Sequence, residues 1–83
     1  MFNSFTVSGS SLNLLKVGER GVISRVRGSN PTVAEQLSRL GLSPGTSITL
    51  EQRFPRFVIR TRKGPLALTQ AMIQSIYVRI AAF

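Results

Sequence analysis

The sequence predicts a small, mainly β domain in which five short strands form a barrel, with one short α-helix after the first strand. A further helical turn is expected before the last strand. Two observations lead to this prediction. Apolar and polar residues alternate over several short segments, and turn-forming glycines and prolines separate these segments closely. With 83 residues, the chain forms one domain that buries only about 60% of its unfolded surface, so its core must be efficient.

The first elements are a helical turn and a strand. Residues 11–15 are expected to form a single helical turn with Ser11 as its N-cap, because a serine hydroxyl can accept a hydrogen bond from a free backbone N–H. A strand follows over residues 20–27. Its apolar positions do not alternate strictly, so we expect a β-bulge near Ser24.

The helix that follows is short and has two alternative starts. Asn30 can cap a helix whose first residue is Pro31. Alternatively, Thr32 and Glu35 form a capping box, in which the glutamate reaches back to the cap. With either start, three apolar residues fall on one face at helical spacing: Val33, Leu37 and Leu40. The helix should depend on packing, since isolated helices this short are marginal in water.

The junction after this helix is the change of chain direction that the sequence predicts most clearly. Gly41 stands where a left-handed C-cap is expected, because glycine accepts that conformation at little cost. Residues 43–46 suit a type II turn, in which Pro44 fixes φ at the second position and Gly45 supplies the positive φ at the third. Alternation then predicts a strand over residues 47–54. We interpret these glycines and this proline as structural turn residues.

Three more strands complete the predicted barrel. A reversal at residues 55–56 and a turn at residues 63–65 separate strands at 57–62 and 66–68. Thr69 is expected to cap a helical turn over residues 70–73. In the last strand, over residues 76–80, alternation predicts three core residues: Ile76, Val78 and Ile80.

The chain offers few groups for catalysis or metal binding. It has no cysteine or histidine, which excludes disulfides and Cys/His zinc sites, and only three acidic residues. We interpret Glu19 as a turn residue, Glu35 as a helix-capping partner and Glu51 as an exposed strand residue. The sequence therefore predicts that the protein is not an enzyme, has no cofactor and forms no strong iron site.

Positive charge is the main functional feature of the composition. The net charge is +8, and nine of the eleven cations are arginine, which favours an anionic partner. The candidate partner-binding residues flank one predicted hairpin and the helix before it: Arg39, Arg53, Arg56, Arg60, Arg62 and Lys63. Arg60 and Arg62 are expected to share one strand face. The alternative is that these charges only solvate a strand edge and prevent strand addition.

Two phenylalanines flank the reversal within this basic region. Phe54 and Phe57 either belong to the core or are exposed beside the arginines as an aromatic and basic surface. We favour the core for both, because aromatic side chains are usually buried.

The N-terminal segment differs from the rest of the chain. Residues 1–10 are interpreted as a flexible tail and residues 11–83 as the single domain. The tail lacks the basic start and long apolar stretch of a signal peptide, and no apolar run approaches the roughly 18 residues of a membrane span. Together with the absence of cysteine, this is compatible with the cytoplasm.

Four segments carry a resemblance to a known family: residues 15–19, 37–46, 60–64 with 66–68, and 76–78. The most specific is a leucine-rich helix that ends in Gly-Leu-x-Pro-Gly-Thr and precedes an alternating strand. In this order the segments resemble the FeoA family, small cytosolic proteins of bacterial ferrous-iron uptake, over residues 12–80. The chain departs from the family in its short loop at residues 54–56, which contains no acid, and in its strongly basic composition.

The resemblance implies an SH3-like barrel and an accessory role beside FeoB, the membrane ferrous-iron transporter with a cytosolic GTP-binding domain. It also implies a cytoplasmic location. Similar domains occur at the C-termini of iron-dependent repressors, so the fold alone does not define the role. We expect docking on FeoB through the helix at residues 32–40 and the arginine-rich hairpin.

Two other associations follow from the residues alone. The alternative to FeoB is a basic SH3-like module that binds nucleic acid or another anion, with an affinity that falls steeply with salt. Exposed strand edges also allow self-association as a dimer or trimer.

Overall fold

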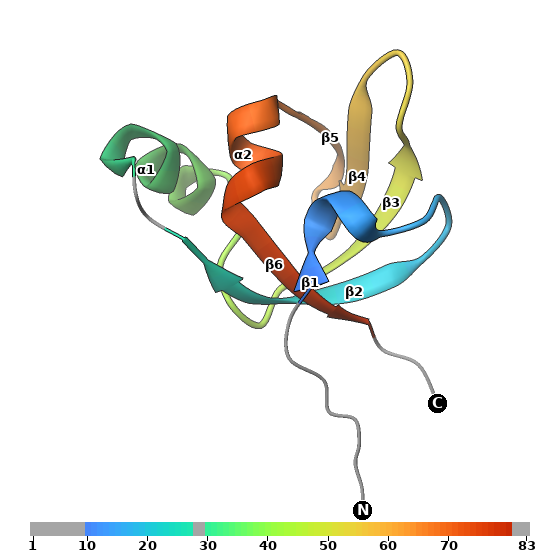
Figure 1. Cartoon of the computed structure of the whole chain (residues 1–83), viewed down its shortest axis with the longest axis horizontal. Helices are drawn as coiled ribbons and strands as arrows, with labels where there is room; N and C mark the ends of the chain where they lie inside the picture. Colours follow the sequence, from blue (N-terminus) through green and yellow to red (C-terminus); the bar gives the residue numbers. More distant parts are fainter. Residues whose placement is uncertain (1–9, 28–29, 81–83) are drawn as a thin grey trace, which may run out of the picture.

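The computed structural model describes residues 10–27 and 30–80. One antiparallel sheet curves around the core, and the helices lie on one side of it (Figure 1). The hydrogen-bonded strand order is β1-β6-β2-β3-β4-β5. The strands are β1 (Ser10–Ser11), β2 (Arg20–Val26), β3 (Ser47–Gln52), β4 (Phe57–Thr61), β5 (Gly64–Leu68) and β6 (Ile76–Ile80). The helices are the 3-10 turn η2 (Leu12–Leu14), α1 (Pro31–Arg39) and α2 (Gln70–Ser75).

The mainly β fold class is confirmed, but the sheet contains six strands where the sequence predicted five. The additional strand is β1, in which Ser10 pairs with Val78 and Ser11 with Tyr77. It is too short and polar to be detected by alternation. Within the described residues, β1 and β5 end the sheet order and do not pair with each other. Ser10, predicted as part of the tail, is therefore a strand residue, and residues 1–9 lie outside the described part.

The predicted helical turn and β-bulge are both confirmed. The Ser11 hydroxyl accepts a hydrogen bond from the Asn13 N–H (3.3 Å), which caps η2. Between β2 and β6 the register shifts between Ile23 and Arg25, so Ser24 is the extra residue of a bulge.

Asn30 is the N-cap of α1, and the first of the two alternative starts is correct. Its side-chain oxygen accepts a hydrogen bond from the Thr32 N–H (2.9 Å), and Pro31 is the first helical residue. The predicted capping role of Glu35 is wrong, because its carboxylate instead pairs with Arg39 one turn later (3.4 Å). The apolar face behaves as expected, since α1 buries Val33 and Leu37.

The predicted corner after α1 is confirmed in detail. Gly41 has a φ of 79°, and the Leu42 N–H donates to the Leu37 carbonyl (2.9 Å), the six-to-one bond of a Schellman cap. Gly45 has a φ of 97°, and the Thr46 N–H closes the turn on the Ser43 carbonyl (3.1 Å). The turn is also held against β2, because the Gly45 N–H donates to the Ile23 carbonyl (2.7 Å).

Replacing Gly45 with valine should lower the free energy of unfolding by about 1–3 kcal/mol, since a β-branched residue is strained at positive φ. A Cβ at this position would meet no atom within 4 Å, so the cost isolates backbone strain from steric clash. Urea unfolding measures the change. Ser43→Val, at an exposed position of the same turn, is the matched control and should change stability by less than about 0.5 kcal/mol. An unchanged midpoint for Gly45→Val would contradict the turn assignment.

Three predicted boundaries in the second half are wrong. β3 ends at Gln52 and not at Phe54, because a second register shift follows Leu50 and the chain turns before the cis peptide bond Phe54–Pro55. β4 ends at Thr61, so Arg62 lies in the turn and does not share a strand face with Arg60. β5 begins at Gly64 and includes Pro65, which suits an edge strand because proline lacks a donor for a further pairing.

The last two elements follow the prediction, with one exception. Thr69 caps α2 by accepting a hydrogen bond from the Met72 N–H (3.3 Å). In β6, Ile76 and Val78 are buried as expected, but Ile80 is 38% exposed. Ile80 is the last residue of its strand and lies opposite a glycine, Gly21, so no side chain covers it from β2.

Every element except β1 contributes to a single core. Within residues 10–27 and 30–80, no polar or charged side chain is buried. Helical and strand residues meet in this core, which explains why the short helices are stable. Its largest fully buried side chains are Leu12, Leu15, Ile23, Leu37, Leu42, Ile48, Leu50, Ile59, Ile76 and Val78.

Candidate protein-interaction site

The six candidate cations do not form one patch. Arg53 and Arg56 lie in the loop before β4, whereas Arg62 and Lys63 lie in the turn after it. Arg62 follows Arg56 by six positions along largely extended chain, a span of about 20 Å. Arg39, at the end of α1, lines the same surface hollow as Lys63. The structure therefore divides the basic set into two groups at opposite ends of β4.

Two members of the set have acidic partners. Arg60 forms an ion pair across the strands with Glu51, and Arg39 forms the helical pair with Glu35. Both pairs are exposed or half-exposed, so each contributes little to stability. Their charges are partly compensated, which leaves four members without a glutamate partner: Arg53, Arg56, Arg62 and Lys63.

Arg53 has a structural function. Its guanidinium donates hydrogen bonds to the Leu15 carbonyl (2.6 Å) and the Asn13 carbonyl (2.9 Å), and it lies 5.5 Å from the centre of the Phe57 ring. These contacts tie the loop after β3 to η2 and the residue that follows it, which are far away in the sequence. Arg53 therefore supports the loop that carries Phe54 and Arg56.

Replacing Arg53 with alanine should lower the free energy of unfolding by about 1–3 kcal/mol, because a partly buried carbonyl loses a charged donor. Amide hydrogen exchange should also speed up around Asn13 and Leu15. Arg56→Ala is the matched control and should change stability by less than about 0.5 kcal/mol, since its side chain is exposed. Equal effects of the two changes would contradict the structural role of Arg53.

A groove of about 580 Å³ lies between this loop and α2. Phe57, Leu68 and Ile73, each no more than 8% exposed, form its apolar floor. The loop residues Phe54, Pro55 and Arg56 line one side, and Thr69 and Gln70 line the other. We call this feature the loop groove. Sequence reasoning missed its α2 side, because nothing in the local pattern indicates that residues 69–73 face the loop.

The two phenylalanines beside the groove differ, although the sequence placed both in the core. Phe57 is 8% exposed, whereas Phe54 is 85% exposed. Phe57 starts β4 on the side that faces the core, and Phe54 belongs to the reversal, which the chain projects beyond the sheet. An exposed aromatic side chain at the edge of an apolar groove is typical of a protein-binding surface.

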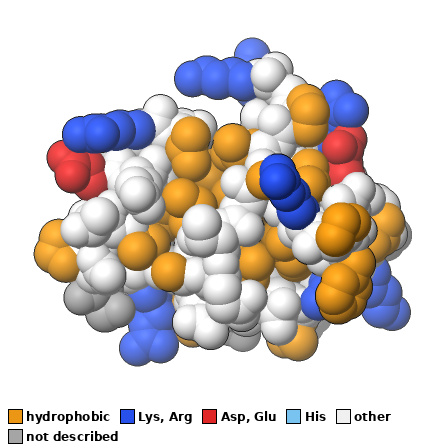
Figure 2. Space-filling view, turned by 90° about the horizontal axis from the view of Figure 1, so that it is seen from above, with side chains coloured by type: hydrophobic (Ala, Val, Ile, Leu, Met, Phe, Trp, Pro, Cys, Tyr) orange, Lys and Arg blue, Asp and Glu red, His pale blue; other side chains and the backbone are white. Residues whose placement is uncertain are grey.

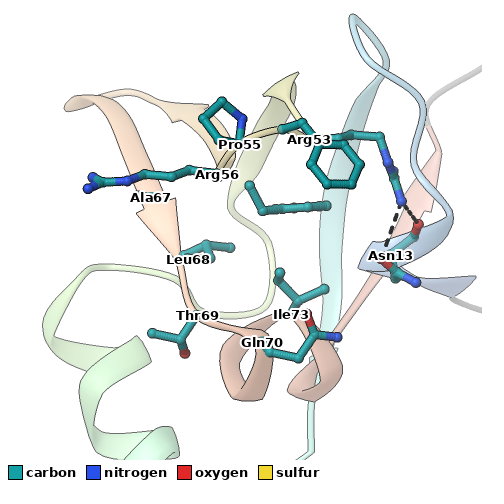
Figure 3. A pocket seen from close by; sticks show the side chains of 11 residues that line it. Asn13, Arg53, Pro55, Arg56, Ala67, Leu68, Thr69, Gln70 and Ile73 are labelled. Atoms are coloured by element: carbon teal, nitrogen blue, oxygen red, sulfur yellow. Dashed lines mark hydrogen bonds between the residues drawn. The ribbon is translucent and has the colours of Figure 1, made fainter.

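Two arginines of the loop before β4, Arg53 and Arg56, line the groove. Figure 3 shows the Arg53 side chain directed to Asn13, while Arg56 extends along the other side of the loop. Figure 2 shows the face that carries α1, α2 and the loop before β4: hydrophobic side chains are exposed across it, with Lys and Arg mainly near its edges. Such a surface accepts an apolar side chain flanked by acidic residues.

The fold is that of a small SH3-like domain. Within residues 10–27 and 30–80, no three residues among His, Cys, Asp and Glu gather where they could hold a metal ion. A family model, the FeoA domain, matches residues 10–80. The chain is 44% identical over 78 residues to the "Putative Fe(2+) transport protein A" of Leptolyngbya boryana, covering 93% of this chain and 95% of that protein. The chain belongs to the FeoA family.

Solved structures share the fold at low sequence identity. A FeoA-like protein from Clostridium acetobutylicum superimposes with a TM-score of 0.83 at 20% identity, covering 94% of this chain and 93% of that one. A manganese-dependent transcriptional repressor gives a TM-score of 0.82 at 18% identity, covering 90% of this chain but only 38% of the repressor. The same fold therefore occurs alone and as part of a longer regulator.

Proposed function

We propose that this protein is an accessory, regulatory component of ferrous-iron uptake that binds the cytosolic GTP-binding region of the FeoB transporter. The family carries the proposal: the FeoA domain match covers residues 10–80, and the relative from Leptolyngbya boryana is named for Fe(2+) transport. The protein acts by binding and not by catalysis, since it has no histidine or cysteine and only three acids. Its site of action is the cytoplasm.

The loop groove is the proposed contact surface. Its floor residues are already folded into the core, so an apolar side chain of FeoB would find a preformed apolar surface there. Phe54 supplies a large exposed ring, and Arg56 supplies a positive charge for an acidic residue next to that side chain. The exposed face of α1 is polar because the apolar stripe of the helix is buried. It therefore offers less apolar contact area than the groove.

None of the helices in residues 10–27 and 30–80 has the length and hydropathy needed to cross a bilayer.

Co-purification tests the proposal. The tagged full chain should retain the FeoB cytosolic region from a lysate at low salt and, less strongly, at high salt, because apolar contacts persist when charges are screened. Deleting the gene should reduce ferrous-iron uptake. Failure to retain the FeoB region at micromolar concentration, together with unchanged uptake, would refute the proposal.

A further inference from the structure

Arginines from two neighbouring strands gather on the side of the sheet away from the helices. In the register of β2 and β6, Val22 lies opposite Arg79 and Arg25 lies opposite Tyr77. Arg20 precedes Val22 by two residues and shares its face, which places it diagonally across from Arg79 at about 7–8 Å between Cα atoms. The intervening residues point to the core: Ile23, Ile76 and Val78.

The β-bulge brings Arg25 to this face. Ile23 pairs with Val78 and Arg25 with Tyr77, so Ser24 is an additional residue without a partner of its own. Without the bulge, alternation would turn Arg25 toward the core. The Ser24 hydroxyl donates a hydrogen bond to the Tyr77 carbonyl (3.2 Å), which holds the bulge in place.

Arg27 extends the row at the end of β2. Its guanidinium donates to the Tyr77 hydroxyl (3.4 Å), and the Arg25 guanidinium lies 5.4 Å from the centre of the same ring. We call the four exposed residues the arginine face: Arg20, Arg25, Arg27 and Arg79. They were not among the candidates chosen from sequence, because only the strand register brings them together.

The positive charge of the arginine face has no acidic partner among the glutamates. The chain has only three acidic residues. Each is engaged elsewhere: Glu35 with Arg39, Glu51 with Arg60, and Glu19 with the Lys16 backbone N–H. Four guanidinium groups on one gently curved surface therefore create a concentrated positive potential.

An exposed aliphatic side chain lies near one end of this face. Val17 is 58% exposed and lies in the turn that leads into β2, three residues before Arg20. Apolar side chains beside a basic surface can enter the headgroup region of a bilayer while the charges contact anionic lipids.

We propose that the arginine face is a docking surface for an anionic lipid bilayer. The bilayer presents a negatively charged plane, and the sheet presents four arginines that have no glutamate partner, with Val17 in the turn at one end. The loop groove lies on the helix side of the sheet, so the docked protein keeps the groove accessible (Figure 1). The proposal uses a different surface from the proposed FeoB contact and does not depend on it.

The residues of this face favour a bilayer over single-stranded nucleic acid. Binding to single strands relies on aromatic rings that are free to stack on bases. Tyr77 is the only tyrosine, its ring lies beneath Arg25, and its hydroxyl is bound by Arg27. Val17 has no function in phosphate binding but suits the interface of a membrane.

Vesicle co-sedimentation of the full chain tests the proposal. The wild-type protein should bind vesicles of phosphatidylcholine mixed with phosphatidylglycerol and should not bind pure phosphatidylcholine vesicles. The double variant R20Q/R79Q should bind the anionic vesicles roughly 30-fold more weakly, because each arginine near an anionic surface contributes about fivefold. The control R39Q/R56Q loses the same two charges at positions outside the arginine face. Its affinity for the anionic vesicles should remain within about threefold of wild type.

Two outcomes with vesicles would overturn the proposal: no binding to anionic vesicles, or an equal loss of binding in both double variants. A third would be that the wild-type protein binds an oligonucleotide more tightly than anionic vesicles and that R20Q/R79Q abolishes this binding. Far-UV circular dichroism and the unfolding midpoint would verify that both variants are folded. If R20Q/R79Q still retains the FeoB region, the arginine face is not needed for that contact. If vesicle binding fails while FeoB retention persists, the bilayer proposal alone is refuted.

Discussion

Leu50→Ala should lower the free energy of unfolding by about 2–5 kcal/mol, because it removes a buried side chain and leaves a cavity. Leu50 is 0% exposed and lies in the middle of β3. Its backbone is also bonded to the turn before β2, with the Gly18 N–H donating to the Leu50 carbonyl (2.7 Å). A domain of this length has a stability of about 4–12 kcal/mol, so much of it would be lost. Urea unfolding measures the change.

Val17→Ala provides the comparison for this prediction. Val17 is also aliphatic but 58% exposed, so its truncation should alter stability by less than about 0.5 kcal/mol. If Leu50→Ala costs no more than Val17→Ala, the placement of β3 in the core is incorrect.

Phe54→Ala should weaken binding to the FeoB cytosolic region by at least about 30-fold while leaving the fold unchanged. The expected loss corresponds to about 2 kcal/mol or more, the range of an aromatic residue that is central to an interface. Phe54 is 85% exposed, so its truncation removes no core contact in the free protein. Titration calorimetry measures the affinity, and thermal unfolding verifies the fold.

Val17→Ala is the matched control for binding, because it truncates another exposed hydrophobic side chain that lies away from the loop groove. Its affinity for the FeoB region should remain within about threefold of wild type. Equal weakening by the two variants would show that the groove has no special role.

Local chemistry made the corner after α1 predictable. Positions 41 and 45 have a positive φ, which favours glycine, and Pro44 directly precedes Gly45. The corner is therefore determined by three residues that lie close together in the sequence. The caps at Ser11 and Thr69 were predicted for the same reason, because each hydroxyl bonds a backbone N–H within three residues.

Distant contacts were not predictable in this way. β1 consists of two serines whose pairing with β6 depends on the position of the last strand. The difference between Phe54 and Phe57 depends on where the sheet ends, which a register shift in β3 determines. Neither is encoded in the local alternation of apolar and polar residues.

The candidate site shows the same division between local and distant effects. Composition correctly directed attention to arginine, but pairing decided which arginines are available. Arg60 meets Glu51 across two strands, and Arg53 reaches backbone carbonyls about 40 residues earlier. The groove floor combines β4, β5 and α2, so only the folded chain brings it together.

The central claim is that the loop groove binds the FeoB cytosolic region, and one calorimetric comparison tests it most directly. Arg56→Gln and Arg62→Gln remove the same charge from the two ends of β4, and only Arg56 lines the groove. Arg56→Gln should weaken binding about tenfold, as expected for a charged contact near an interface centre, while Arg62→Gln should leave the affinity within about twofold. Equal affinities of the two variants, or a larger loss for Arg62→Gln, would contradict the assignment of the groove.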